Sequence, residues 1–303
     1  MQTTSHLLMI RPAKFSFNEE TAINNSFQSK ENDEKAHDKA LKEFDEFVNI
    51  LRKNGVDVTV IKDTALPYTP DSIFPNNWVS FHNDGTVCLY PMYALNRRLE
   101  RKSQVLQAIS DKFEIKRKVD LTFYEDKNLF LEGTGSMVLD RENKIAFACI
   151  SPRTDIDVLN EFSKLMDYYT VVFHSVDEKE RPIYHTNVMM CIADHYAVVC
   201  LESLPIEEEK EKLVKSLEGS GKELIEISFE QMNHFAGNML QVNNNKNEKL
   251  LIMSSQAYHS LNGEQLSKIQ AFNRILHSPL YTIERNGGGS ARCMIAEVHL
   301  PLN

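Results

Sequence analysis

Apolar residues occur along the chain in two recurring patterns, short runs typical of buried strands and longer stretches with helical spacing. Residues 31–54 carry the clearest helical stretch, which ends at Asn54-Gly55, a common helix stop. Its apolar positions are Ala36, Ala40, Phe44, Phe47, Val48 and Leu51. Short apolar runs at residues 6–10 and 56–61 predict strands on either side of this helix. The polar residues 13–30 are a candidate loop over a site.

A hairpin, a helix and a strand then follow one another in the same order four times. The predicted hairpins pair residues 78–81 with 86–90, 136–139 with 145–150, 188–193 with 196–201, and 239–242 with 250–253. The predicted helices cover residues 97–113, 155–167, 207–217 and 262–275, and the strands that follow them cover 115–119, 170–174, 224–227 and 280–283. The last strand, 294–299, has the N-terminal strand as its natural partner, which makes a fifth unit.

Repeats of about 50 to 60 residues usually close into a ring, because each unit buries its apolar face only against its neighbours. The sequence therefore predicts one α/β domain over residues 1–303. We expect a closed five-bladed α/β propeller with pseudo-fivefold symmetry, in which the N- and C-terminal strands pair.

Composition and charge narrow the class of ligand. The 303-residue chain has a formal net charge of -9 and a pI of about 5.6, so nucleic acid and anionic membranes are repelled on balance. No apolar run is long enough to span a bilayer, and the N-terminus lacks the features of a signal peptide. We expect a cytoplasmic protein that acts on a small molecule, with no nucleic-acid or membrane partner. A homo-oligomer is compatible with the sequence.

The stretch 286–294 holds the first candidate for chemistry. Three consecutive glycines let the backbone turn sharply and lead to Cys293, with Arg292 beside it. A nearby cation and inward-facing N–H groups favour the thiolate, which is the nucleophilic form of cysteine. The other four cysteines lie in apolar runs and are expected to be small buried hydrophobes; they are Cys88, Cys149, Cys191 and Cys200.

The repeats place several polar residues at equivalent positions, directly before or at the start of a hairpin. These residues are Asn77, Glu132, His185, Asn238, Arg292 and Cys293. Equivalent positions in a ring of repeats converge on its axis, and a catalytic cysteine needs an acid or base and a group that orients it. His185 has this placement, and Glu132 would suit a protonated His185 as partner. The alternatives are a structural histidine and an exposed turn acid.

Several short motifs resemble those of the guanidine-modifying superfamily of arginine deiminases, amidinotransferases and dimethylarginine dimethylaminohydrolases. They are Glu132-Gly133, His185-Thr186-Asn187 and the stretch 287–294, together with residues 70–74, 96–100 and 151–154, which match dimethylarginine hydrolase segments. The six motifs occur in the right order and span nearly the whole chain. The resemblance implies the five-bladed α/β propeller called a pentein, in agreement with the repeat count.

The resemblance also implies roles for individual residues. It implies that Cys293 is the nucleophile, that His185 is the general acid/base, and that Glu132 orients His185. It implies that Arg97 and Arg153 hold the α-carboxylate of the substrate, a task that suits the forked guanidinium. Asp71 would place a carboxylate near the amino end of the substrate. The alternative for each arginine is a solvated helix charge.

The sequence departs from the superfamily where guanidinium-binding acids are expected. Members that act on guanidinium groups clamp the cation with acids, whereas Asn76, Asn77 and Asn187 stand at those positions here. A buried guanidinium facing amides would lose on the order of several kcal/mol of charge pairing. An asparagine offers N–H donors and a C=O acceptor, which complement a ureido group. We therefore interpret the three asparagines as substrate-binding residues.

These observations predict a hydrolase of citrulline or a similar ureido amino acid. Attack by Cys293 would give a covalent intermediate and then ornithine, carbon dioxide and ammonia, as in the citrulline-utilisation hydrolase branch that the sequence resembles. An arginine-type deiminase or amidinotransferase, with Asp71 or another acid supplying the charge, stays open. So does a non-catalytic propeller that serves as a binding module. No phosphate-loop or metal-binding motif is present, and we expect neither a cofactor nor a metal.

Overall fold

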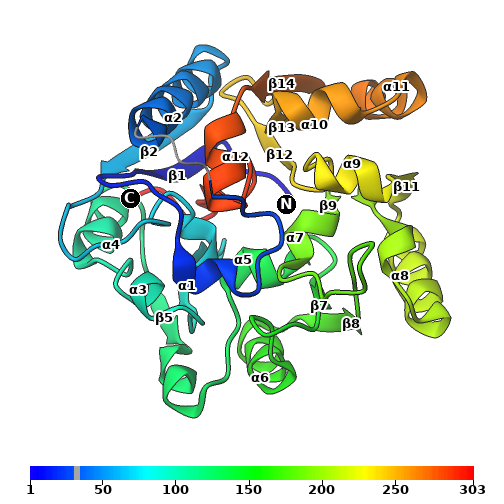
Figure 1. The fold of residues 1–303 in the computed structure, drawn as a ribbon, viewed down its shortest axis with the longest axis horizontal. Helices are drawn as coiled ribbons and strands as arrows, with labels where there is room; N and C mark the ends of the chain where they lie inside the picture. The colour runs from blue at the N-terminus through cyan, green and yellow to red at the C-terminus, as the bar shows by residue number, and fades with distance from the viewer. Residues whose placement is uncertain (31–34) are drawn as a thin grey trace.

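The computed structural model describes residues 1–30 and 35–303 and contains five three-stranded sheets arranged in a ring (Figure 1). The strands are β1 (His6–Arg11), β2 (Asp57–Lys62), β3 (Val79–Phe81), β4 (Thr86–Leu89), β5 (Arg117–Asp120), β6 (Val138–Asp140), β7 (Ile145–Cys149), β8 (Tyr169–Phe173), β9 (Met190–Ile192), β10 (Tyr196–Val199), β11 (Glu223–Glu226), β12 (Leu240–Asn243), β13 (Lys249–Ser254), β14 (Arg274–Ser278) and β15 (Ala296–Glu297). One sheet has the order β15-β1-β2, and the other four each take three consecutive strands. The predicted five-unit propeller is confirmed. Residues 31–34, part of the first predicted helix, lie outside the described residues.

In every sheet the central strand pairs antiparallel with one neighbour and parallel with the other. β4 runs antiparallel to β3 and parallel to β5, so that Cys88 lies opposite both Ser80 and Val119. In the first sheet β1 is central: it runs parallel to β2 and antiparallel to β15, with Leu7 opposite Glu297. The predicted pairing of the two terminal strands is therefore confirmed, and this pairing closes the ring.

The longer helices cover the outside of the ring, whereas the short helices α1, α5, α7 and α12 gather near its centre (Figure 1). The α-helices are α1 (Glu19–Ala22), α2 (Ala36–Lys53), α3 (Leu95–Arg98), α4 (Ser103–Ser110), α5 (Gly133–Ser136), α6 (Ile156–Met166), α7 (Thr186–Met189), α8 (Glu207–Gly219), α9 (Phe229–Asn233), α10 (Ser255–Ser260), α11 (Gly263–Phe272) and α12 (Tyr281–Gly287). Three 3-10 helices complete them, η1 (Pro75–Asn77), η2 (Thr122–Lys127) and η3 (Leu201–Ser203). In the described part of the chain, no helix has the length and apolar character that crossing a membrane requires.

β1 is apolar on both faces because both faces lie against neighbouring units. Leu7 and Met9 pack in one cluster with residues of α2, β12 and β13. Leu8 and Ile10 pack in another cluster with residues of β3 and β4, including Val79. Successive side chains of a strand point to opposite sides, so a strand buried on both faces needs a continuous apolar run.

One predicted strand is wrong. Residues 280–283 lie at the start of helix α12, and the strand that follows α11 is β14, which pairs parallel with β13. Leu280 and Ile283 are both buried. A spacing of three suits one face of a helix, and a short apolar run does not distinguish the two structures by itself.

Other predicted elements have different bounds. The predicted helix 262–275 ends at Phe272, and its last two residues begin β14. The predicted helix 97–113 is two helices, α3 and α4, because the chain leaves the helical path where the Lys102 N–H bonds to the Glu100 carbonyl. The side chain of Glu100 turns inward at this break and pairs with Arg97. The predicted hairpin at residue 188 begins later, since Val188 and Met189 belong to α7.

Candidate active site

A short helical turn precedes the first strand of three successive units and carries polar residues to the centre of the ring. Asn77 ends η1, Glu132 caps the N-terminus of α5, and His185 caps the N-terminus of α7. Asn238 directly follows a turn that comes before β12, and Cys293 lies in the turn that comes before β15. The structure therefore brings these residues together at the centre of the ring, as the repeat pattern predicted.

The glycine-rich stretch packs closely against its neighbours and presents Cys293 to a small cavity. Gly288 has a positive φ of 62°, and a Cβ there would lie 2.5 Å from Asn25 Nδ2. The Cys293 N–H donates to the Ser290 carbonyl at 3.0 Å, which closes the turn. The cavity is narrow: about 10 Å³ is open to the centre of a water molecule, within an empty space of about 250 Å³ that includes open solvent. It is lined by Thr21, Asn25, Asp71, Phe74, Asn77, Arg97, Arg153, Tyr184, His185, Gly287, Gly289 and Cys293.

A larger hollow, with about 670 Å³ open to the centre of a water molecule, contains none of the predicted site residues. It lies along α9 and α10 and is lined by polar side chains such as His234 and His259. Its volume is large because it opens broadly to solvent. The chemistry-bearing residues mark the smaller cavity at the ring centre as the candidate active site.

His185 and Glu132 form a buried pair at the wall of this cavity. The imidazole Nε2 donates to Glu132 Oε2 at 2.8 Å, and the Tyr93 N–H donates to Glu132 Oε1 at 3.0 Å. Burial alone would raise the pKa of Glu132, but the charge of Arg153 and the His185 hydrogen bond outweigh it and lower the pKa to about 2. Glu132 is therefore an anion that fixes the orientation of the imidazole.

His185 itself is neutral at physiological pH. Burial lowers its pKa from 6.5 to about 4, and the nearby charges of Arg153 and Arg97 act in the same direction against the attraction of Glu132. The sequence led us to expect a protonated His185 as the partner of Glu132. The structure instead gives a neutral His185 imidazole with its proton on Nε2. Nδ1 is then the nitrogen left to accept a proton, and His185 lines the cavity.

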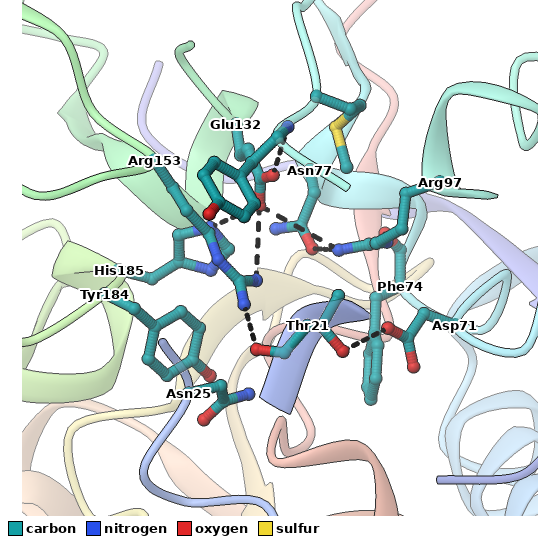
Figure 2. Close-up of polar contacts among 12 residues, drawn as sticks. Thr21, Asn25, Asp71, Phe74, Asn77, Arg97, Glu132, Arg153, Tyr184 and His185 are labelled. Carbon is teal, nitrogen blue, oxygen red and sulfur yellow. Dashed lines mark hydrogen bonds and ion pairs between the residues drawn. The ribbon is translucent and has the colours of Figure 1, made fainter. Parts of the chain in front are cut away.

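The two predicted carboxylate-binding arginines approach Glu132 from two sides (Figure 2). Arg97 donates to both carboxylate oxygens of Glu100 and to Asn77 Oδ1 at 2.7 Å. Arg153 donates to the Thr21 carbonyl and stacks on Tyr184, with 4.9 Å between the guanidinium carbon and the ring centroid. Both are buried and line the cavity, so they are not solvated helix charges. Their contact with a substrate carboxylate stays a prediction.

Asp71 lies at the edge of the cavity beneath the N-terminal segment. Its Oδ2 accepts from Asn18 Nδ2 at 2.7 Å and from Thr21 Oγ1 at 3.0 Å, whereas its Oδ1 is buried and has no partner in the described structure. Burial raises the pKa of this carboxyl group. The candidate loop at residues 13–30 does lie over the site, where Gln28 Nε2 donates to the Asn286 carbonyl at 3.0 Å.

The three predicted substrate-binding asparagines have different surroundings. Asn77 lines the cavity, and its Nδ2 is buried without a partner in the described structure. Asn187 lies beside the candidate nucleophile, with its Nδ2 3.5 Å from Cys293 Sγ. Asn76 is fully buried but is not among the residues that line the cavity. Their roles in substrate binding stay predictions.

Two features near Cys293 were missed or misjudged. The guanidinium of Arg292 turns away from the cysteine and bonds to Glu297 Oε2 and the Ile295 carbonyl, both at 2.9 Å. The expected cation is therefore near the thiol without bonding to it: burial lowers the pKa of Arg292, while the charge on Cys293 acts to raise it. Asn238, whose Nδ2 lies 3.2 Å from Cys293 Sγ, was not predicted as a site residue, although its repeat position placed it near the axis.

The other four cysteines are buried, as predicted. Burial raises the pKa of Cys88 and Cys191 to about 12 and that of Cys149 and Cys200 to about 11. Among the described residues, no group of three His, Cys, Asp or Glu side chains is arranged to hold a metal ion.

Comparison with known proteins places the chain in a family. The sequence profile of the family described as N,N dimethylarginine dimethylhydrolase, eukaryotic, matches residues 11–300. The chain belongs to this family. The family's description is that of a hydrolase of guanidino compounds, and the resemblance of the motifs to the guanidine-modifying, or pentein, superfamily is confirmed. A search of curated proteins gave no match.

Solved structures share the fold of this family member at low sequence identity. It superposes on unliganded ArgZ, an arginine dihydrolase from cyanobacteria, with a TM-score of 0.76 and 18% identity, covering 98% of this chain and 41% of ArgZ. For the substrate-bound N-terminal domain of ArgZ, the TM-score is 0.75 and the sequence identity is 18%, and the match covers 98% of each chain. For a dimethylarginine dimethylaminohydrolase that carries an S-methyl-L-thiocitrulline adduct, the TM-score is 0.67 and the sequence identity is 15%. The match covers 97% of this chain and 99% of that one. The present chain thus spans about two fifths of full-length ArgZ.

The lowered pKa of His185 predicts a loss of stability in mild acid. Between pH 6.5 and about 4 the unfolded chain binds a proton at His185 that the folded protein does not, so the free energy of unfolding falls as the pH falls. The stabilisation that comes from the lowered pKa of Glu132 is lost at lower pH, between pH 4.5 and about 2. Urea unfolding at pH 7, 6 and 5 should therefore show a shallower pH dependence in His185→Asn than in the wild type. His82 and His299, whose pKa values are also lowered, contribute equally to both proteins. Equal slopes would contradict the neutral His185.

Proposed function

We propose that this family member hydrolyses the ureido group of citrulline, giving ornithine, carbon dioxide and ammonia. The observation that carries the proposal is the orientation of the Asn77 amide. Its Oδ1 accepts from Arg97, and its Nδ2 is a buried donor at the cavity wall that has no partner among the described residues. A ureido oxygen can accept from this donor. A guanidinium offers only donors and would leave it unpaired.

The charges around the cavity support a substrate with one cationic group. Arg97 pairs with Glu100, and Arg153 lies 3.5 Å from Glu132. Among the described residues that line the cavity, Asp71 is then the one acid. An α-ammonium group bound there leaves no lining carboxylate for a second cation, and an unpaired buried charge is costly. Citrulline has a neutral head group and meets this condition, whereas arginine does not.

The catalytic residues supply the proton transfers that the reaction needs. Cys293 Sγ attacks the ureido carbon, its proton passes to Nδ1 of the neutral His185, and His185 delivers that proton to the nitrogen that departs with the C–N electron pair. Water then loses a proton to His185 and attacks the thiocarbamoyl carbon. The C–S bond breaks, sulfur recovers its electron pair, and the carbamate decomposes to an amine and carbon dioxide. Glu132 holds Nε2 protonated throughout.

A second candidate is hydrolysis of a guanidino substrate such as arginine or dimethylarginine. The unpaired Oδ1 of Asp71 favours it, because this buried carboxylate oxygen could face a guanidinium if the substrate bound in the opposite direction. The family described above and the arginine dihydrolases of the same fold make this the natural alternative. A non-catalytic binding role is less well supported, because it gives no use to the buried His185–Glu132 pair beside a cavity cysteine.

Incubating the enzyme separately with citrulline, arginine and dimethylarginine separates these functions. We expect ornithine and ammonia from citrulline, at a kcat/KM at least about 100-fold above that for either guanidino compound, since a misplaced buried donor gives discrimination of that order. Cys293→Ala serves as the control for a covalent route and should be inactive. Citrulline accumulating from arginine would contradict the proposal, and full activity of Cys293→Ala would revive a non-catalytic role for this cavity.

Asn77→Asp tests the donor that recognises the ureido oxygen. The change keeps the acceptor for Arg97 and replaces the Nδ2 donor with a carboxylate oxygen of nearly the same shape. We expect kcat/KM for citrulline to fall by about 100-fold and the ratio of arginine to citrulline turnover to rise. Asn273→Asp is the matched control, because Asn273 is also buried with an Oδ1 that accepts hydrogen bonds but does not line the cavity. An unchanged ratio in Asn77→Asp would rule out this mode of recognition.

A further inference from the structure

Two asparagine side chains donate to the sulfur of Cys293. Asn238 Nδ2 lies 3.2 Å from Sγ and Asn187 Nδ2 lies 3.5 Å from it, within the distances expected for hydrogen bonds to sulfur. Both asparagines are fully buried, so water does not compete for these donors. The sequence motifs indicate a substrate-binding role for Asn187 and assign none to Asn238.

The surrounding bonds fix the direction of the Asn238 amide. Its Oδ1 accepts from the Arg292 N–H at 3.0 Å, and its Nδ2 also donates to the Asn187 carbonyl at 2.9 Å. Turning the amide over would place its oxygen against that carbonyl oxygen and its NH₂ against a backbone N–H. Both contacts are repulsive, so the donor side of Asn238 has to face the sulfur.

Among the described residues, the hydrogen bonds to the Cys293 sulfur come from these two amides, and none comes from a cation. Arg292, the neighbour of Cys293 in the chain, bonds instead to Glu297 and to the Ile295 carbonyl. Asn238 thus acts twice on the nucleophile: it holds the backbone at Arg292 and it donates to Sγ. A donor aimed at sulfur stabilises the thiolate more than the thiol. It therefore helps both the loss of the thiol proton and the release of the thiolate when the C–S bond breaks.

We infer that Asn238 is a catalytic residue of this enzyme and that, together with Asn187, it stabilises the Cys293 thiolate by neutral hydrogen bonds. This inference rests on the proposed function only in that Cys293 is the nucleophile, and it holds for a ureido or a guanidino substrate alike. It also assigns Asn187 a role in binding the sulfur of Cys293 and not the head group of the substrate. The two amides together do for this cysteine what a neighbouring cation does in other thiolate sites.

Alkylation of Cys293 by iodoacetamide, followed by mass spectrometry of its peptide at a series of pH values, tests the inference without any substrate. In Asn238→Ala we expect the midpoint of alkylation to rise by about one pH unit and the rate at pH 7 to fall about tenfold. Asn187→Ala should give a smaller shift in the same direction, because its donor is farther from the sulfur. The other four thiols are buried with raised pKa values and should react slowly.

Asn273→Ala is the matched control, because it removes a buried asparagine that bonds to Tyr196 and Gln241, away from the sulfur. Circular dichroism establishes that each variant is folded; if Asn238→Ala is not, Asn238→Ser and Asn187→Ala decide. An unchanged midpoint in the folded variants, or an equal shift in Asn273→Ala, would overturn the inference. A shifted midpoint in an enzyme that does not hydrolyse citrulline would leave the inference standing and reject the proposed substrate.

Discussion

The buried carboxylate of Glu132 is the contact on which the site depends. It is fully buried, and an isolated carboxylate in such a place would be strongly destabilising. Its partners come from three successive units of the ring: Tyr93 and Arg97 from the second, Arg153 from the same third unit as Glu132, and His185 from the fourth. The anion is therefore tolerated only when the ring has brought these units together, and the catalytic geometry follows from closure of the fold.

The polarity of the cavity follows from how these charges compensate one another. Each of the two arginines that line the cavity has an acid of the protein beside it, and Asp71 is the one acid among the described residues that line the cavity. Near the reacting atoms the protein presents amides, and the bonds to Arg97 and to the Arg292 N–H turn the donor sides of Asn77 and Asn238 inward. Neutral donors suit a carbonyl oxygen and a thiolate. They do not suit a guanidinium.

The repeat pattern predicted most of the fold, because each unit buries its apolar residues against its neighbours and so leaves a periodic trace in the sequence. The same periodicity is enough to predict that Glu132, His185 and Cys293 lie at the axis. It failed at residues 280–283, where a short apolar run suits a strand and a helix equally and only the pairing of β14 with β13 decides between them.

Side-chain direction could not be predicted in the same way. Arg292 adjoins Cys293 in sequence, yet the backbone turn sends its guanidinium to Glu297, a residue of β15. Asn238 stood at an axial position, but its value as a donor depends on which end of its amide the Arg292 N–H engages. The direction of such a side chain is set by contacts between residues far apart in the chain. A pattern along the sequence does not reveal these contacts.

The covalent chemistry of Cys293 gives the most direct test of this account. Rapid acid quench during a single turnover of citrulline labelled with carbon-13 at the ureido carbon, followed by mass spectrometry of the Cys293 peptide, would capture the thiocarbamoyl intermediate. The account predicts label on Cys293 from citrulline and none from arginine labelled at its guanidino carbon. Label from arginine alone would contradict the central claim that the site is built for a neutral ureido group.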